Sequence, residues 1–400
     1  MSAAPAAFAI GVATTSCEIA ALAGEWEALE AATPEATGFQ SYAWCRGWID
    51  ARRAPPGVFR IVTLREAGRL AMLWPLQLDR PFGARVLRWL GEPMTQYGDA
   101  LARESAARPA WRAAIQAEIR SWRDVDLVAL TRLRADGVLR GAGLEPTAQG
   151  EALSAPFVDL TDPEASHRRH RSAARRERRL ALIGGVELES AASPARRLDY
   201  VGRALAWKGL WLRGRSYPSA GLSLEATPVF LQRLALNEAL DAHALRVGSR
   251  VVAIEIGFSR GGAYRALIAG YDPDYAAGAP GHALTRRLIA HYAGQGLATY
   301  DFLAPDDPYK RAFASGATSL AAHFAPRTGL GRVAGFALAR LRPAAKRMVW
   351  TLARLKRHVR DGARRIARAV LREGASDGCA FGENFPDGLR RPAGAARRSR

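Results

Sequence analysis

The segment AGYDPDYAAGAPGHALTRRLIAHY, residues 269–292, has the residue types of an anion site at the start of a helix. Pro280 suits the first helical turn, and Gly281 lets a ligand approach the backbone closely. Three amides are therefore expected to point outward without partners, those of Gly281, His282 and Ala283. Exposed amides and the helix dipole attract negative charge. A loop that merely turns the chain also needs glycine and proline, so both interpretations stay open locally.

Glu255 is a candidate general base, because it stands in the middle of the apolar strand pattern VVAIEIGF. Burial among apolar neighbours would raise the pKa of its carboxyl group and suit it to accept a proton. The alternation of a strand could equally point Glu255 toward solvent on an open sheet face. The sequence favours neither alternative.

Length and composition predict a folded protein of two domains in a reducing compartment. The chain has 400 residues, of which 48% are hydrophobic, enough for a large buried core. Its three cysteines, Cys17, Cys45 and Cys379, are far apart, which argues against a disulfide framework. No pattern of a signal peptide or membrane span is found. We expect a cytoplasmic location, with peripheral association with the inner membrane as an option.

The positive charge is concentrated toward the C-terminal end. The formal net charge is +20, and residues 331–400 contain 18 basic and 5 acidic residues. Nearly all basic residues are arginine, a bias that base composition of the genome can produce, so total charge alone is weak support for a partner. The position of the charge is more informative.

The order of the predicted elements occurs twice along the chain. The first series is a strand at 8–13, a helix at 19–31, an aromatic segment FQSYAWCRGW, an antiparallel meander, a helix at 106–122 and the strand VDLVAL. The second has three strands with turns at Gly248-Ser249 and Gly261-Gly262, a helix at 282–293 and the strand ATYDFL. Two related α/β domains follow from this repetition. The boundaries we expect are 1–160, 161–240 for a basic helix and connecting region, 241–328, 329–373 for a basic helical tail and 374–400 for a flexible end.

Several stretches resemble the GNAT N-acetyltransferase superfamily. The main one is AYRALIAGYDPDYAAGAPGHALTRRLIAHYAGQGLATYDFLAPDDPYKRAF, and EWEALEAA, FQSYAWCRGW and SAARRERRLALIGGVELE are similar to further segments of its CelD-like branch, associated with cellulose and exopolysaccharide gene clusters. The resemblance covers residues 8–325 and extends to the Fem aminoacyltransferases. It departs from the branch at DFLAPDD, where a glycine often follows DF.

The resemblance implies an α/β (α+β) fold of tandem GNAT-like domains, each a mixed, mostly antiparallel sheet flanked by helices, with a basic C-terminal helix. It implies acetyl-CoA or another acyl-CoA as co-substrate and no metal. The residues implied at the cofactor are Ala269, Gly270, Tyr271, Gly281, His282, Ala283 and Arg286.

The resemblance also implies a proton donor at Tyr309, in DDPYKRAF, which would protonate the leaving thiolate. Burial as a packing residue is the alternative. Lys310 could meet an acidic or phosphorylated acceptor. Asp272 and Asp301 stand at strand ends, where they could orient an amine or hydroxyl acceptor or simply cap turns.

Two basic segments could meet partners. Arg168, Arg171 and Arg175 follow helical spacing in SHRRHRSAARRERRLALIGG, which gives a cationic stripe for a sugar phosphate, a lipid-linked acceptor or tRNA, or a solvated helix face. The tail VWTLARLKRHVRDGARRIARAVLRE has the pattern of a basic amphipathic helix. It could lie on an anionic membrane or dock on the protein itself.

Other chemistries lack sequence support. The histidines form no zinc pattern, and no phosphate-binding Walker loop, dinucleotide fingerprint or nucleophile elbow occurs. The expected function is an acyl-CoA-dependent N- or O-acyltransferase in cell-envelope or exopolysaccharide biosynthesis. The alternatives are a Fem-like enzyme that uses aminoacyl-tRNA and a non-catalytic scaffold for polysaccharide synthesis at the membrane.

Overall fold

The computed structural model describes residues 8–141, 144, 153–162, 177–215, 219–345, 347–349 and 351–352. The chain divides into two units, residues 1–347 and residues 348–400. All strands and helices named below belong to the first unit.

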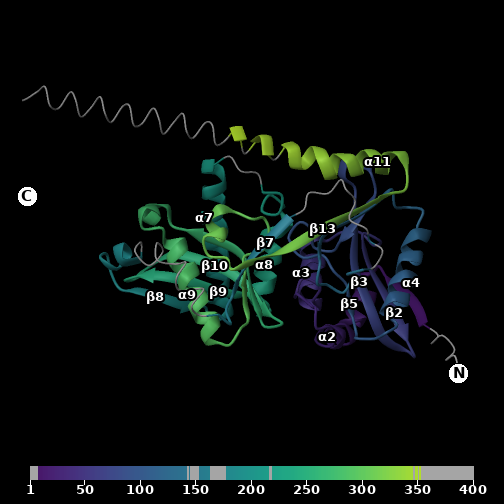
Figure 1. Ribbon diagram of the computed structural model, residues 1–400, viewed down its shortest axis with the longest axis horizontal. Coiled ribbons are helices and arrows are strands. Elements are labelled where there is room, and N and C mark those ends of the chain that lie inside the picture. The colour runs from purple at the N-terminus through teal and green to yellow at the C-terminus, as the bar shows by residue number, and fades with distance from the viewer. Residues whose placement is uncertain are drawn as a thin grey trace, which may run out of the picture. The chain divides into compact units, whose positions relative to one another are not determined.

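A single sheet runs through the first unit (Figure 1). Its strands are β1 (Phe8–Ala13), β2 (Phe59–Glu66), β3 (Arg69–Asp79), β4 (Val86–Trp89), β5 (Leu101–Ala102), β6 (Leu127–Arg134), β7 (Leu153–Asp159), β8 (Val186–Ser190), β9 (Asp241–Val247), β10 (Arg250–Arg260), β11 (Ala263–Tyr271), β12 (Thr299–Asp301) and β13 (Gly316–Pro326). Their order across the sheet is β1-β2-β3-β4-β6-β13-β7-β12-β11-β10-β9-β8, and β5 pairs with β3 away from this path.

The helices lie between these strands. They are α1 (Ser16–Ala21), α2 (Ala23–Ala31), α3 (Tyr42–Arg52), α4 (Arg108–Ser121), α7 (Pro194–Arg215), α8 (Ala226–Leu236), α9 (Pro280–Gly294), α10 (Pro308–Arg311) and α11 (Gly329–Phe336), with the 3₁₀-helices η1 (Pro81–Gly83) and η2 (Pro273–Gly278) and the π-helical segment η3 (Ala337–Leu341). The single helix expected at 19–31 is instead the pair α1 and α2, which meet at Leu22. The helices expected at 106–122 and 282–293 are confirmed as α4 and α9.

The two halves repeat one pairing pattern, which confirms the predicted tandem fold. In the first half β2, β3 and β4 are antiparallel, and β4 then pairs in parallel with β6. In the second half β9, β10 and β11 are antiparallel, and β11 pairs in parallel with β12. One helix separates the parallel strands in each case, α4 and α9, as parallel connections require.

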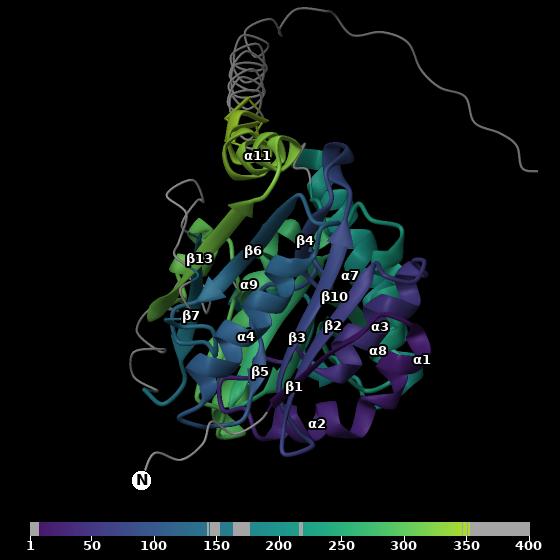
Figure 2. The same ribbon diagram turned by 90° about the vertical axis from the view of Figure 1, so that its right-hand side faces the viewer.

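The halves exchange strands where they meet. β7 pairs with β12 of the second half, and β13 pairs with both β7 and β6. Figure 2 shows β13 and β7 beside β6, with α4 covering the first half of the sheet. The boundary expected at residue 160 therefore follows a strand that completes the sheet of the second half.

Separate cores cover the two faces of the second half. Ala244, Ile254 and Ile256 pack with α7 and α8, while Leu245 and Ala253 pack with α9. The side chains alternate between faces because successive residues of a strand point in opposite directions. The aromatic residues of FQSYAWCRGW belong to the first of these cores, as expected.

Candidate active site

The centre of the second half is a gap between two parallel strands. β11 and β12 pair only from Ala263 to Arg265 opposite Thr299 to Asp301. β12 ends there, whereas β11 continues through residues 266–271. Within the described part of the chain, no strand pairs with residues 266–271 on the side that faces β12. This edge of β11 has main-chain groups that can bind an extended ligand.

A β-bulge lies at the start of this gap. Ile256 faces Ile268 and Gly257 faces Ala266, so Leu267 is an extra residue on β11. Gly257 is required there, since a Cβ atom would lie 2.4 Å from the Arg265 carbonyl oxygen and from the Tyr264 hydroxyl. Bulges commonly occur beside active sites, where they redirect a strand.

Glu255 lies on β10 directly opposite Ala269 of β11 and is only 3% exposed. The alternative that it faces solvent is therefore wrong. Its Oε1 accepts a hydrogen bond from the Tyr300 hydroxyl. Burial raises the pKa of Glu255 to about 7, opposed by the hydrogen bond from the Tyr300 hydroxyl and by the charge of Lys310. The carboxyl group thus changes its protonation near neutral pH, as a general base must.

Tyrosines and a histidine surround Glu255 on the α9 side of the sheet. Tyr264 stacks on Tyr292 with ring centroids 4.1 Å apart and lies 5.2 Å from Tyr300. His243, opposite Glu255 on β9, shares a 2.6 Å hydrogen bond with the Tyr292 hydroxyl. Burial lowers the pKa of His243 to about 3, so this ring is neutral. The sequence did not identify these four residues as candidates, because aromatic residues in strands and helices usually indicate packing in the core.

Tyr309, on α10, is 42% exposed, so it is not fully buried, although its ring packs against other aromatic rings. Its ring contacts His282, at the start of α9, and Phe302, after β12, both with centroids 6.2 Å apart. Although the ring is partly open, desolvation and the negative charges of Glu255 and Asp307 raise the pKa of Tyr309. The hydroxyl therefore remains protonated and able to donate.

Lys310 does not have the place expected for a group that meets an acceptor. It is buried, and its Nζ donates to the carbonyl oxygens of Leu303 and Pro305 at 2.8 and 2.9 Å. Burial lowers its pKa to about 8. The amine therefore stabilises the loop between β12 and α10, and this loop positions α10 and its residue Tyr309.

The two aspartates have different surroundings. Asp272 caps η2, with its Oδ1 accepting from the Asp274 amide at 3.0 Å, which is the turn-capping alternative. Asp301 is buried and accepts from the Tyr97 hydroxyl at 2.9 and 2.7 Å and from the Leu303 amide at 2.8 Å. The Tyr97 bond links the first half of the chain to the second.

Two of the three amides expected to be unpaired at the start of α9 have hydrogen-bond partners. Ala279 has a left-handed backbone with φ 48°, and its carbonyl oxygen accepts from His282 at 3.0 Å and Ala283 at 3.4 Å. The expectation that these two amides are unpaired is therefore wrong, because the helix begins with a tight turn. At Gly281 the space is open, since the nearest atom to an added Cβ is Tyr271 Cδ1 at 3.8 Å.

Arg286 is held by a carboxylate of the chain itself. Its Nε donates to Glu177 Oε2 at 2.8 Å, and Arg287 Nε donates to Glu177 Oε1 at 2.7 Å. Glu177 is buried, and Leu180 from the same segment packs against Gly278. The expected contact of Arg286 with a cofactor phosphate would have to compete with this ion pair. Arg168, Arg171 and Arg175 lie outside the described residues.

Helix α7 crosses β11 on the face of the sheet opposite to α9. A Cβ atom on Gly270 would lie 2.9 Å from the Ala204 carbonyl oxygen and 3.1 Å from Trp207 Cβ, so helix packing by itself requires this glycine. Lys208 Nζ lies 4.5 Å from the centre of the Trp211 ring, a cation–π distance. The charge of Lys208 also contributes to the lowered pKa of Lys310.

Two classes of feature are not found among the described residues. No group of three or more His, Cys, Asp or Glu side chains could hold a metal ion. No helix in the described ranges has the length and apolar character needed to cross a bilayer.

The fold is similar to that of a solved protein, FemX. The chain resembles the structure of FemX at 10% identity, over 77% of this chain and 96% of that one, with a TM-score of 0.52. It also aligns with the C-terminal DUF2156 domain of a proposed lysylphosphatidylglycerol synthetase from Agrobacterium fabrum (13% identity, 74% and 89% covered, TM-score 0.48). A tandem GNAT protein from the clavulanic acid biosynthesis pathway aligns at 12% identity, 80% and 98% covered, with a TM-score of 0.41.

The sequence comparison concerns the second half. No curated protein matches the sequence. Residues 166–311 match the family described as Acetyltransferase (GNAT) domain, a range that contains β11, α9, β12 and Glu255. Over residues 166–311 the chain is therefore similar to GNAT-type acetyltransferase domains.

Proposed function

We propose that the protein transfers an acyl group directly from acyl-coenzyme A, acetyl-coenzyme A in the first instance, to an amine or hydroxyl acceptor. The observation that carries this proposal is the gap where β11 leaves β12 beside the buried Glu255. A linear ligand can lie along the free edge of β11 and bring its reactive end to a group that titrates near neutral pH.

The residues present fit this donor. Residues 266–271, with Ala269 and Tyr271 among them, would hold the pantetheine arm through main-chain hydrogen bonds. The open space at Gly281 would admit the pyrophosphate at the positive end of the α9 dipole. The amides of His282 and Ala283 already donate to the Ala279 carbonyl oxygen. The binding of the pyrophosphate would therefore rest mainly on the helix dipole and on the open space at Gly281. When bound, the donor supplies an activated thioester carbonyl.

Two side chains would move protons in the transfer. Glu255, in its carboxylate form, accepts the proton from the acceptor amine or hydroxyl, directly or through a water molecule. Tyr309, protonated at neutral pH, donates to the thiolate as it leaves. The acyl group passes directly to the acceptor, so no covalent intermediate on the protein is needed.

The bulk of the acceptor would lie on the α7 face of the sheet, and its amine or hydroxyl group would reach through the gap between β11 and β12 to Glu255 on the α9 side. Trp207, Lys208 and Trp211 combine flat apolar surfaces with a cation, which suits a sugar with an anionic group. Arg168, Arg171 and Arg175 would add further positive charge. We propose an acceptor of the cell envelope or an exopolysaccharide, such as a lipid-linked sugar phosphate, in keeping with the resemblance to the CelD-like branch, and a cytoplasmic site of action.

Calorimetric titration of acetyl-coenzyme A tests the donor site. Wild-type protein is expected to bind near the micromolar range, about −8 kcal/mol, and Gly281→Glu is expected to abolish binding. The added carboxylate would occupy the open space and repel the pyrophosphate. Gly294→Glu is the matched control, because it makes the same change at the other end of α9, where an added Cβ meets no atom within 4 Å.

Absence of binding by the wild type would exclude coenzyme A as the donor. Aminoacyl-tRNA would then be the leading donor, an alternative supported by the positive charge and by the FemX-like fold. In that case activity should fall steeply with salt concentration and be lost after ribonuclease treatment. Loss of function only on removal of the C-terminal tail would favour the scaffold alternative.

Tyr309→Phe tests the proton donor. We expect kcat to fall by roughly 10- to 100-fold, because the thiolate would leave without a positioned acid. The affinity for acetyl-coenzyme A should be unchanged, since the partly exposed ring keeps its contacts with His282 and Phe302. Steady-state kinetics and calorimetry separate these effects. An unchanged kcat would remove Tyr309 from the mechanism.

A further inference from the structure

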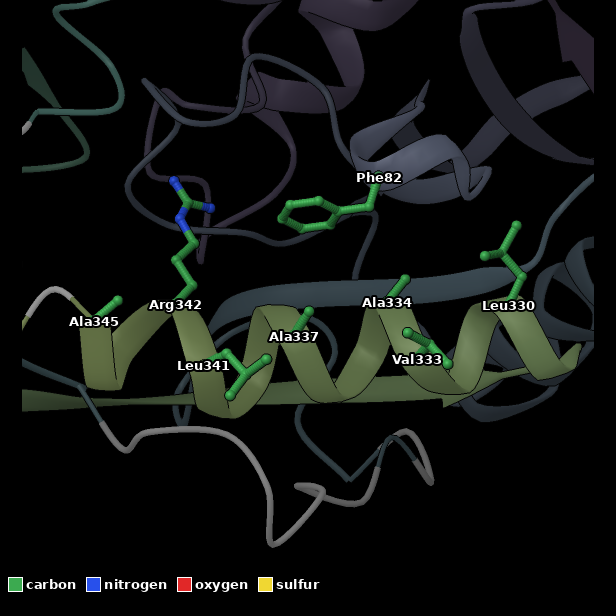
Figure 3. Close-up of a pocket in the computed structure, with 8 residues that line it drawn as sticks. All are labelled: Phe82, Leu330, Val333, Ala334, Ala337, Leu341, Arg342 and Ala345. Atoms are coloured by element: carbon green, nitrogen blue, oxygen red, sulfur yellow. The ribbon is translucent and has the colours of Figure 1, made fainter.

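An apolar groove lies between the β3–β4 connection and the C-terminal helix of the first unit (Figure 3). Its volume is about 540 Å³, and its lining is apolar except for Arg342. Phe82, in η1, reaches over the helix with its ring 71% exposed. A single exposed apolar side chain is common, but a contiguous exposed apolar patch marks an interaction site.

The helix presents a second set of exposed apolar side chains. Val333, Leu341, Phe336 and Leu330 are exposed by 67%, 55%, 54% and 47%. They come from α11 and η3, which continue one another along β13 (Figure 1). Together with Phe82 they form what we call the apolar ridge.

The ridge is held in place by small residues on the inner side of the helix. A Cβ atom on Gly331 would lie 1.8 Å from the Asp126 carbonyl oxygen, so the helix backbone touches the residue just before β6. Ala334 and Ala339 are buried against Ala84 and Leu127. The Thr328 hydroxyl accepts from the Gly331 amide and donates to Asp126 Oδ1, each at 3.0 Å. The apolar side chains are therefore fixed outward by the fold.

The helix that carries most of the ridge has charges of one sign. Residues 327–347 include five arginines and one lysine but no aspartate or glutamate. Arg332, Arg340 and Arg342 are exposed on the same helix as the apolar side chains. Apolar side chains on a helix that carries arginines and no acidic residues match the interface of an anionic bilayer, where apolar groups enter the acyl region and cations meet lipid phosphates.

We propose that the apolar ridge docks the protein on an anionic membrane, with Phe82 and Val333 entering the lipid and Arg332 and Arg342 at the headgroups. This places membrane contact on the folded first unit and not only on the basic tail. The proposal does not depend on acyl transfer. A site of action at the membrane surface would bring a lipid-linked acceptor within reach.

Vesicle co-sedimentation of the full-length protein tests the proposal. We expect binding to vesicles of phosphatidylglycerol and phosphatidylcholine, and much weaker binding to phosphatidylcholine alone. Phe82→Ser with Val333→Ser should weaken binding at least about tenfold, because two apolar side chains no longer enter the bilayer. Leu182→Ser with Ile183→Ser is the matched control, since these side chains are 88% and 65% exposed but lie far from the ridge in sequence.

Charge reversal tests the headgroup contact in the same assay. Arg332→Glu with Arg342→Glu should weaken binding, whereas Arg69→Glu with Arg250→Glu, the same change of charge at two exposed hairpin residues, should have a much smaller effect. Unchanged binding after the ridge substitutions would overturn the proposal and assign binding to the tail. Failure of the wild type to bind anionic vesicles would also overturn it. A dimer in sedimentation analysis that the ridge substitutions dissociate would show that a second copy covers the ridge instead.

Discussion

Glu255→Gln is expected to lower kcat by roughly 10²- to 10⁴-fold while leaving the affinity for acetyl-coenzyme A unchanged. The amide cannot accept the proton of the acceptor, and this loss is in the usual range for a positioned general base. The side chain keeps its shape and a hydrogen-bond acceptor for the Tyr300 hydroxyl. Steady-state kinetics with a fixed acceptor and calorimetry of donor binding measure the two quantities.

The pH dependence gives the same substitution a second signature. The carboxylate is the active form, so wild-type kcat/KM should rise with pH and level off above about 7, the raised pKa of Glu255. In Glu255→Gln this rise should be absent. If instead the variant keeps the rise, another group is the base.

Stability should change in the opposite sense to activity. Burial raises the pKa of Glu255 from 4.5 to about 7 in the folded state. Its contribution to stability is therefore complete below the unfolded-state pKa and is lost as the pH increases through about 7. Glu255→Gln avoids a buried charge, so above that pH it should gain up to about 3 kcal/mol relative to wild type. Chemical denaturation at several pH values measures this gain.

Glu187→Gln is the matched control for these experiments. Glu187 is exposed on the edge strand β8, so its substitution should change neither kcat nor the pH dependence of stability. A loss of activity in Glu255→Gln together with reduced stability at every pH would point to a structural role for Glu255.

Much of the fold could be predicted from local patterns. The strands β9, β10 and β11 are rich in apolar residues, and turns with glycine separate them. Gly248, Gly261 and Gly262 in these turns all adopt positive φ angles. These patterns lie within short segments of the sequence, and the structure has the strands and turns that they predict. The strand β13 was not predicted. Its sequence GATSLAAHFAP consists largely of small residues, and its partner β6 is distant in the chain, so no local pattern identifies it.

The sequence predicted where the candidate site lies but not the burial and hydrogen bonds of its residues. The mid-strand position of Glu255 was clear, yet its burial depends on Tyr264 and Tyr300 from two other strands. The pairing of Arg286 with Glu177 joins residues 109 positions apart. The hydrogen bonds at the start of α9 depend on the left-handed backbone of Ala279, which an alanine does not signal. Contacts between distant segments decide these features, and periodicity does not report them.

Asp301→Asn is expected to destabilise the protein by about 3 kcal/mol. Asp301 faces Arg265 across the parallel pair of β11 and β12, and both residues are buried. Burial lowers the pKa of Arg265 to about 10, and the charge of Asp301 opposes that shift. The substitution would remove the negative charge that most offsets the burial of Arg265. Urea denaturation at neutral pH measures the change, and Asp306→Asn, in the exposed pair with Arg311, should cost less than about 1 kcal/mol.

The bond between Tyr97 and Asp301 makes this cluster a connection between the two halves of the sheet. Tyr97→Phe should cost about 1–2 kcal/mol, because Asp301 loses one of its buried donors. The double variant should cost less than the sum of the single changes, since each removes the same bond. If Asp301 is structural, kcat per folded molecule in Asp301→Asn should change little. A large increase in KM for the acceptor at unchanged stability would instead show that Asp301 orients the acceptor, and would move the acceptor site to the junction between the halves.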